Sequence, residues 1–139
     1  MKIRQRGLTL VELLISMVIV AVLAAVALPT YQGQLRKGNR AAAQALLVNI
    51  ANRQAQYMLD ARNYAVGPAA LVALNVVPPT EVAAYYTLAI ENASGGTTPS
   101  TPPSFTVKAT PIAGTRQQAD GALMLTHDGS KTRGSNPGW

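Results

Sequence analysis

The chain has 139 residues, room for about one domain, and no cysteine, which excludes a disulfide framework and a thiolate metal site. Its formal charge is +6, from 12 basic and 6 acidic residues; three of the basic residues precede Leu8, and without them 9 minus 6 leaves +3. Half of the net positive charge is therefore a signal about membrane topology, and the overall charge is weak support for nucleic-acid binding.

The first 28 residues combine a basic start with a long apolar run. Lys2, Arg4 and Arg6 come first, and the 21 residues Leu8–Leu28 are enough to cross a hydrocarbon core of about 30 Å. One carboxylate, Glu12, lies near the start of this run. Because an isolated charge in hydrocarbon costs roughly 3 to above 10 kcal/mol on different scales, Glu12 is a candidate functional residue that needs a partner.

Two ordinary interpretations fit this segment. It reads as a single-pass membrane anchor with the three N-terminal cations in the cytoplasm, as the positive-inside rule requires. It also reads as a secretory signal peptide, because Ala25-Val26-Ala27 fits the small-x-small cleavage pattern. The apolar run is long for a signal peptide, and Glu12 interrupts its start, so cleavage there would discard the one unusual residue.

A third interpretation comes from the string RGLTLVELL, residues 6–14, which closely resembles the class III signal of type IV pilins and related pseudopilins. The resemblance implies that a membrane-bound prepilin peptidase cuts between Gly7 and Leu8 and that Leu8 becomes a methylated N-terminus. Glu12 is then the fifth residue of the mature chain. The family most often has Phe where this chain has Leu8. We favour this interpretation over the other two.

Electrostatics supports a role for Glu12 in assembly. Cleavage before Leu8 creates an α-amine near the membrane, and in a filament Glu12 of one subunit can pair with the Leu8 amine of a neighbour. An opposite charge a few ångströms away in a medium of low dielectric constant offsets much of the cost of burial.

The helix is predicted to continue from Tyr31 to about Asp60, which gives about 53 residues and about 80 Å with the apolar run. Pro29 marks the membrane exit or, as the resemblance implies, a kink in one continuous helix. Positions with a helical period form one apolar face with Gln54 as a polar exception: Ala43, Leu46, Leu47, Ile50, Gln54, Tyr57 and Met58. We therefore expect this half to pack on a globular head.

A basic cluster lies where the helix leaves the membrane region, formed by Arg36, Lys37 and Arg40. It is either a solvated face or a site of pairing.

The remaining chain predicts a small sheet. A short helical turn is expected over residues 69–74, followed by strand-like runs at 85–91, 104–110 and 122–127 and a tight turn at Asp128-Gly129. The predicted fold class is α+β, a long N-terminal helix on an antiparallel sheet of three or four strands. We expect residues 1–7 to be the leader, 8–29 the membrane-spanning half of the helix, and 30–139 its amphipathic half with the head.

Two further segments resemble PilE-like pilins. The first runs from Arg40 through Arg53-Gln-Ala-Gln-Tyr57 to Arg62-Asn-Tyr64, and the second runs from Gln117 to Leu125 and on to Gly129 and Trp139. Many such pilins carry two cysteines near the C-terminus, and this chain has neither. A missing disulfide removes about 2–4 kcal/mol of loop constraint. We expect backbone pairing and packing of Trp139 to hold the last ten residues, unless they form a frayed tail.

No motif for catalysis, phosphate binding or metal binding is present. His127 is the single histidine and is expected to be structural or solvent-facing. We predict a protein that is not an enzyme and has no cofactor.

The favoured function is a structural subunit, major or minor, of a type IV pilus that serves adhesion, twitching motility or DNA uptake. The alternatives are a pseudopilin of type II secretion and a DNA-binding pilin for natural transformation, with Lys108, Arg116, Lys131 and Arg133 as candidate phosphate contacts. The implied partners are other pilin subunits, the prepilin peptidase, an inner-membrane assembly platform, the membrane and, in the last case, DNA. The implied location is the inner membrane before assembly, with a cytoplasmic N-terminus, and the extracellular pilus afterwards.

Overall fold

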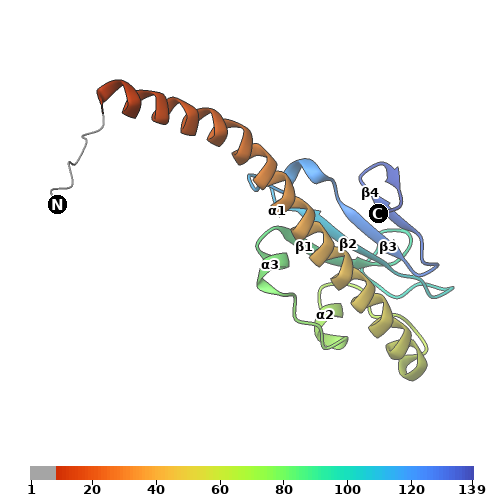
Figure 1. Cartoon of the computed structure of the whole chain (residues 1–139). Helices are drawn as coiled ribbons and strands as arrows, with labels where there is room; N and C mark the ends of the chain where they lie inside the picture. The colour runs from red at the N-terminus through yellow and green to blue at the C-terminus, as the bar shows by residue number, and fades with distance from the viewer. Residues whose placement is uncertain (1–8) are drawn as a thin grey trace. The chain divides into compact units, whose positions relative to one another are not determined.

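The computed structural model describes residues 9–139. Its helices are α1 (Leu10–Ala61), α2 (Ala70–Ala73) and α3 (Thr80–Ala83), and its strands are β1 (Tyr86–Glu91), β2 (Thr106–Pro111), β3 (Leu123–Thr126), β4 (Lys131–Arg133) and β5 (Asn136–Pro137), with a 3-10 turn, η1 (Gln118–Asp120), before β3 (Figure 1). The chain divides into two compact units between Leu35 and Arg36. The second unit, Arg36–Trp139, is called the head below.

Helix α1 has 52 residues and remains helical through Pro29, as expected of one continuous helix. It ends at Ala61, where Arg62 adopts a φ of 55° and its N–H donates to the carbonyl of Met58 at 3.0 Å. A residue other than glycine in this left-handed conformation costs roughly 1 kcal/mol. The chain then turns back toward the sheet through Asn63, whose side-chain oxygen accepts the N–H of Tyr64 at 2.9 Å.

The five strands form an antiparallel sheet in the order of the sequence, β1-β2-β3-β4-β5. The three predicted strands are β1, β2 and β3, and the predicted turn at Asp128-Gly129 joins β3 to β4. The structure adds a short hairpin of β4 and β5, so the sheet exceeds the expected three or four strands. Gly134, with a φ of 56°, and Ser135 form its two-residue loop, in which glycine takes the first central position without steric cost.

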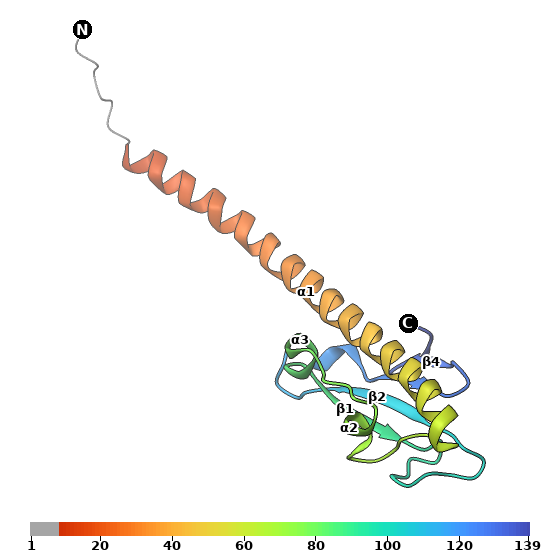
Figure 2. The same ribbon diagram turned by 90° about the horizontal axis from the view of Figure 1, so that it is seen from below.

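The core lies between α1 and one face of the sheet, which the helix crosses in both ribbon views (Figures 1 and 2). The predicted apolar face of α1 is confirmed, since Ala43, Leu46, Leu47 and Ile50 are all buried. Alternate positions of the central strands face them, because successive side chains in a strand point to opposite sides. These buried strand residues are Val107, Ala109, Leu123 and Leu125, and they join the same core cluster.

Gln54, the polar exception on the apolar face, is fully buried. Its amide oxygen accepts the N–H of Ala65 at 2.9 Å, and its amide nitrogen donates to the carbonyl of the same residue at 2.6 Å. Both polar groups of a buried loop residue are thus satisfied by one side chain. Gln54 therefore holds the loop that follows α1 against the C-terminal end of the buried face of the helix.

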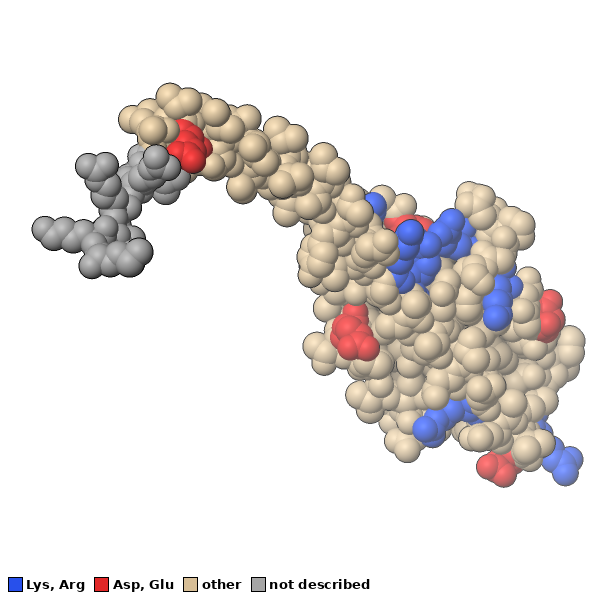
Figure 3. All heavy atoms as spheres, viewed as in Figure 1, with Lys and Arg blue, Asp and Glu red and all other residues tan. Residues whose placement is uncertain are grey.

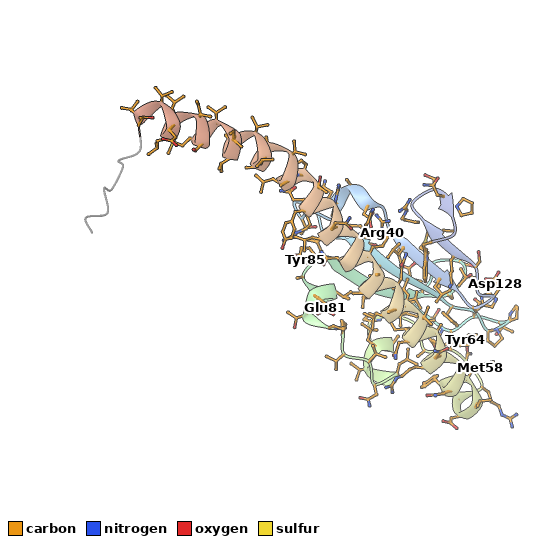
Figure 4. All side chains as sticks on the ribbon, viewed as in Figure 1. Arg40, Met58, Tyr64, Glu81, Tyr85 and Asp128 are labelled. Carbon is orange, nitrogen blue, oxygen red and sulfur yellow. The ribbon has the colours of Figure 1, made fainter. Side chains whose placement is uncertain are left out.

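At the other end of this face, Arg40 binds Asp120 of η1 through both oxygens of the carboxylate. The Arg40 Nε donates to Oδ2 at 2.7 Å, and Nη2 donates to Oδ1. The fully buried Gln117 donates to Oδ2 at 2.9 Å, and the hydroxyl of Tyr86 in β1 donates to the same oxygen at 3.3 Å. Figure 4 shows Arg40 on α1 and Tyr64 at the opposite end of the head. The cluster of Arg40, Tyr86, Gln117 and Asp120 is called the arginine clamp below.

The arginine clamp shifts the pKa values of its members. Burial alone would raise the pKa of Asp120, but the hydrogen bonds from Arg40 and Gln117 outweigh it and lower the pKa. Burial, followed by the nearby charge of Asp120, raises the pKa of Tyr86 to about 12. The hydrogen bond with Asp120 raises the pKa of Arg40. The charged carboxylate, the neutral phenol and the charged guanidinium are therefore the forms that the folded head stabilises.

The last residues are held without a disulfide. The Nε1 of Trp139 donates to the carbonyl of Met124 in β3 at 3.2 Å, and the N–H of Gly138 donates to the carbonyl of Lys131 at 2.7 Å. The Lys131 ammonium lies 4.5 Å from the centroid of the Trp139 ring. Backbone pairing and packing of Trp139 thus organise this segment, and the alternative of a frayed tail is wrong.

We predict that Gln54→Ala lowers the free energy of unfolding by about 2–4 kcal/mol, because it leaves the N–H and the carbonyl of Ala65 buried without partners. Urea unfolding of the full-length protein in detergent, followed by the fluorescence of Trp139, measures this change. Gln56→Ala, at an exposed position on the same helix, is the matched control and should change stability by less than about 0.5 kcal/mol. Equal stability of the two variants would contradict the role of Gln54.

We predict that stability declines between pH 10 and 12 because of Tyr86. The unfolded chain releases this phenolic proton near pH 10, whereas the folded protein keeps it until about 12, so unfolding becomes easier as pH rises through that window. Tyr86→Phe should lower stability by about 1 kcal/mol at neutral pH and make the decline smaller. Urea unfolding at a series of alkaline pH values tests this, with Tyr57→Phe as control. An alkaline decline that is unchanged in Tyr86→Phe would refute the assignment.

Candidate assembly helix and charged head surface

The N-terminal half of α1 is apolar on every side. Its large side chains from Leu10 to Leu28 are all more than half exposed, and an 18-residue window reaches a mean hydropathy of 2.8 with none of it buried. Figure 3 shows no Lys or Arg along this part of the helix. It is long and apolar enough to cross a membrane. An exposed apolar surface of this size marks a site of contact with a membrane or with another protein.

Glu12 lies in the first turn of α1 and is exposed, and among residues 9–139 it forms no ion pair. Its N–H donates to the Oγ1 of Thr9 at 3.3 Å, and the N–H of Leu13 donates to the Thr9 carbonyl at 3.2 Å. Thr9 therefore caps the helix, and Thr9-x-x-Glu12 matches the capping-box pattern, a signal that the sequence analysis missed. A carboxylate here is also favoured by the positive end of the helix dipole. The predicted cleavage site, Gly7-Leu8, lies outside the described residues.

The four candidate DNA contacts do not form one site. Lys108 lies on the outer face of the sheet and pairs with Glu91 at 3.1 Å. Arg116 lies 5.2 Å from the ring centroid of Tyr85, beyond the end of β2. On β4, Lys131 and Arg133 stand opposite the buried Leu125 and Leu123 and so project to the other side of the sheet from Lys108. The structure thus brings together Lys131 and Arg133 and separates them from Lys108.

His127 and Asp128 lie in the exposed turn after β3. The Asp128 carboxylate accepts hydrogen bonds from the Oγ1 of Thr126 and the N–H of Ser130, and these lower its pKa. The His127 ring lies edge-on to Phe105, with 6.4 Å between ring centroids. Across residues 9–139, His, Asp and Glu nowhere gather in a group of three that could hold a metal ion. The turn is therefore accounted for by local hydrogen bonding.

The arginine clamp is a structural arrangement that sequence reasoning missed. The basic cluster Arg36, Lys37 and Arg40 was visible in the sequence, but the sequence did not show that its three members have different partners. Arg40 is neutralised by Asp120, whereas Arg36 contributes its backbone carbonyl, which accepts the Nε2 of Gln117 at 3.2 Å. The available signal was the solitary Asp120, the one acid between Glu91 and Asp128. The remaining charges of the cluster, Arg36 and Lys37, stay on the surface.

Comparisons with known proteins agree with these features. Residues 29–123 match a family profile described as "Type IV minor pilin ComP, DNA uptake sequence receptor", and residues 2–28 match the prokaryotic N-terminal methylation motif. Over 71 residues the chain is 35% identical to the type IV wide pilus major component PilA4 of Thermus thermophilus, a match that covers 51% of this chain and 54% of that protein. The chain therefore spans about half the length of this curated relative.

A type IV pilin from Shewanella oneidensis is similar in structure, with a TM-score of 0.49 and 23% identity over 75% of this chain and 98% of that one. The family profile alone covers more than half of the chain and includes most of the head. This profile favours a pilin over a pseudopilin of type II secretion, whereas the methylation motif fits both. This protein belongs to the type IV pilin family, in the branch described as minor pilin ComP.

Proposed function

We propose that the chain is made as a membrane-anchored precursor and becomes a pilus subunit after removal of its leader. In this proposal residues 1–7 are the leader, prepilin peptidase cuts between Gly7 and Leu8, and Leu8 is methylated. Residues 8–29 span the membrane and then enter the filament core, and residues 30–139 form the rest of α1 and the head. The exposed apolar half of α1 is the observation that carries the proposal, because it needs lipid at one stage and other subunits at the next.

In this proposal Lys2, Arg4 and Arg6, which come just before the apolar run, stay in the cytoplasm, so the head lies on the far side of the inner membrane and reaches the cell exterior with the filament. The partners are the peptidase, the inner-membrane assembly platform and neighbouring pilins. The role is structural, not enzymatic, and serves the adhesion, motility or DNA uptake of the pilus.

Glu12 is proposed as the residue that selects the assembled state. Its side chain has no cation within the described chain, and the Leu8 amine of a neighbouring subunit supplies one after cleavage. In the low dielectric of a helix bundle this pair offsets the burial cost that each charge would carry alone. An unpaired Glu12 in lipid therefore favours docking into a growing filament.

A second candidate function is DNA binding by the head, since the matching family is described as a receptor for DNA uptake sequences. Lys131 and Arg133 support it, because they lie two residues apart on one side of β4, and Lys131 lies against the indole ring of Trp139. Cations that neutralise phosphates release counterions and provide most of the affinity for DNA. Lys108 contributes less in this proposal, because Glu91 already neutralises it.

We predict that Glu12→Ala and Glu12→Gln both sharply reduce the amount of subunit in sheared pili. Glutamine keeps the capping-box pattern with Thr9 but has no charge, so the pair of variants separates helix capping from charge pairing. Immunoblots of sheared and membrane fractions measure incorporation, and mass spectrometry of wild-type pili should show a methylated N-terminal Leu8. Normal incorporation of Glu12→Gln would sink the charge-pairing role, and another N-terminal residue would overturn the cleavage assignment.

We predict that the double variant Lys131→Gln/Arg133→Gln weakens binding of a DNA duplex and lowers the slope of log affinity against log salt by about 1.8, or about 0.9 for each phosphate that is no longer neutralised. Fluorescence anisotropy with the full-length protein in detergent at several salt concentrations measures both quantities. Arg53→Gln/Arg62→Gln removes the same charge from the C-terminal part of α1 and the residue that follows it, and it is the matched control.

The same series tests DNA uptake in cells. Neutralising Lys108, Arg116, Lys131 and Arg133 together should reduce uptake while pili remain assembled. Unchanged uptake rejects the DNA-binding function. An equal reduction of affinity in the control double variant would mean that net charge alone, and no particular surface, accounts for binding.

A further inference from the structure

A pair of basic side chains lies at the start of the head without an acidic partner. From Leu13 to Leu59 helix α1 contains no Asp or Glu. Of its first three cations, Arg40 is engaged by Asp120, whereas Arg36 and Lys37 form no ion pair within the described residues 9–139. Lys37 is exposed and Arg36 is half-buried. Arg36 and Lys37 are called the basic collar below.

The basic collar follows the apolar run closely. Arg36 comes eight residues after Leu28, which is about 12 Å of helix. The headgroup layer adds about 5–8 Å beyond the hydrocarbon on each side, and long basic side chains extend their charge back toward it. Tyr31, which is 64% exposed, lies in between, at a depth where tyrosine commonly marks the membrane interface. The collar is therefore within reach of lipid phosphates while the apolar run spans a bilayer.

The position of these cations is unfavourable for topology. The positive-inside rule disfavours Lys and Arg within 15–20 residues of a span on the translocated side. In the proposed topology this chain nevertheless carries three there, Arg36, Lys37 and Arg40, the same number as the cytoplasmic flank of Lys2, Arg4 and Arg6. The arginine clamp explains one of the three, Arg40. The basic collar has no such structural explanation within the head.

The basic collar is joined firmly to the head. The Arg36 carbonyl accepts the Nε2 of Gln117, a fully buried residue that also binds Asp120 and receives a weak hydrogen bond from Asn39 at 3.4 Å. A ligand on the collar would thus act on the head and on η1 together. It would fix the orientation of the head and not only the helix that leaves the membrane.

We propose that Arg36 and Lys37 bind the phosphates of anionic lipid headgroups on the surface from which the head emerges, and hold the head against the membrane before assembly. The inference rests on the membrane-anchored precursor of the proposed function. A cation near an anionic membrane surface is worth about a fivefold change in the binding equilibrium, so the pair together contributes about 25-fold at low salt. Extraction into the filament breaks these contacts.

The test uses the full-length protein in nanodiscs. Because the chain has no cysteine, Gly38→Cys provides a single site for a bimane dye, and a Cβ at Gly38 meets no atom within 4 Å. Discs of phosphatidylcholine are compared with discs that also contain phosphatidylglycerol, each with a nitroxide on a minority of headgroups. Stronger quenching of the dye in the anionic discs reports the membrane-bound head. The ratio of membrane-bound to free head, which the quenching measures, should fall about 25-fold in Arg36→Gln/Lys37→Gln. It should also fall in wild-type protein at high salt.

Lys131→Gln/Arg133→Gln removes the same charge from another part of the head and should keep the wild-type quenching. The proposal is overturned by equal quenching in neutral and anionic discs, or by an equal decrease in this control. Displacement by inorganic phosphate, but not by sodium chloride of the same ionic strength, would reveal a soluble-anion site instead, and displacement by a DNA duplex would reveal a nucleic-acid site. Failure of the chain to enter discs would refute the membrane anchor itself, whereas Glu12→Gln, which tests filament pairing, should leave the quenching unchanged.

Discussion

The head depends on how α1 is fixed to the sheet. An apolar face from Ala43 to Ile50 provides the burial, and a polar side chain closes each end of it, Arg40 through Asp120 and Gln54 through Ala65. The two ends are 14 residues apart, about 21 Å along the helix. Burial of apolar surface is non-directional and would tolerate sliding or rotation of the helix. The two polar contacts have fixed partners and directions, so they set the register of helix on sheet.

The first half of the same helix differs from this in a way that fits its proposed function. Between Leu13 and Leu28 the apolar residues surround the helix, and none of this stretch is buried within the chain. Among residues 9–139 no polar contact fixes a register there, which fits the proposed transfer of this surface from lipid to neighbouring helices. In a medium without a hydrophobic driving force, selectivity of the proposed assembly would come from the few polar groups, of which Glu12 is the charged one. In this proposal one helix carries a fixed interface and an exchangeable one.

Sequence reasoning succeeded where the signal is local. The apolar run, the helical period from Ala43 to Ile50 and the alternation of Val107 and Ala109 are each patterns within one continuous segment, and each was confirmed. The arginine clamp was missed because 80 residues separate Arg40 from Asp120, and neither segment contains a local pattern that indicates contact with the other. The β4–β5 hairpin was missed although Gly134-Ser135 is a recognised two-residue loop, since three- and two-residue strands carry too little periodicity to detect. Lys108 illustrates a further limit: its charge is visible in the sequence, but its pairing with Glu91 requires the strand register.

The C-terminal hairpin shows how a head without cysteine closes its last loop, and at what cost. A disulfide would constrain this loop by about 2–4 kcal/mol. Here the constraint comes from the short β4–β5 ladder, the Trp139 hydrogen bond to Met124 and the Lys131–Trp139 contact. Exposed cation–π contacts contribute about 0.5–1 kcal/mol, and a hydrogen bond contributes about 1 kcal/mol. Lys131 therefore contributes to closure through a surface contact that a bound phosphate would compete for. If the head binds DNA there, binding and closure of the loop are coupled, because an ammonium that leaves the indole ring for a phosphate no longer holds Trp139 in place.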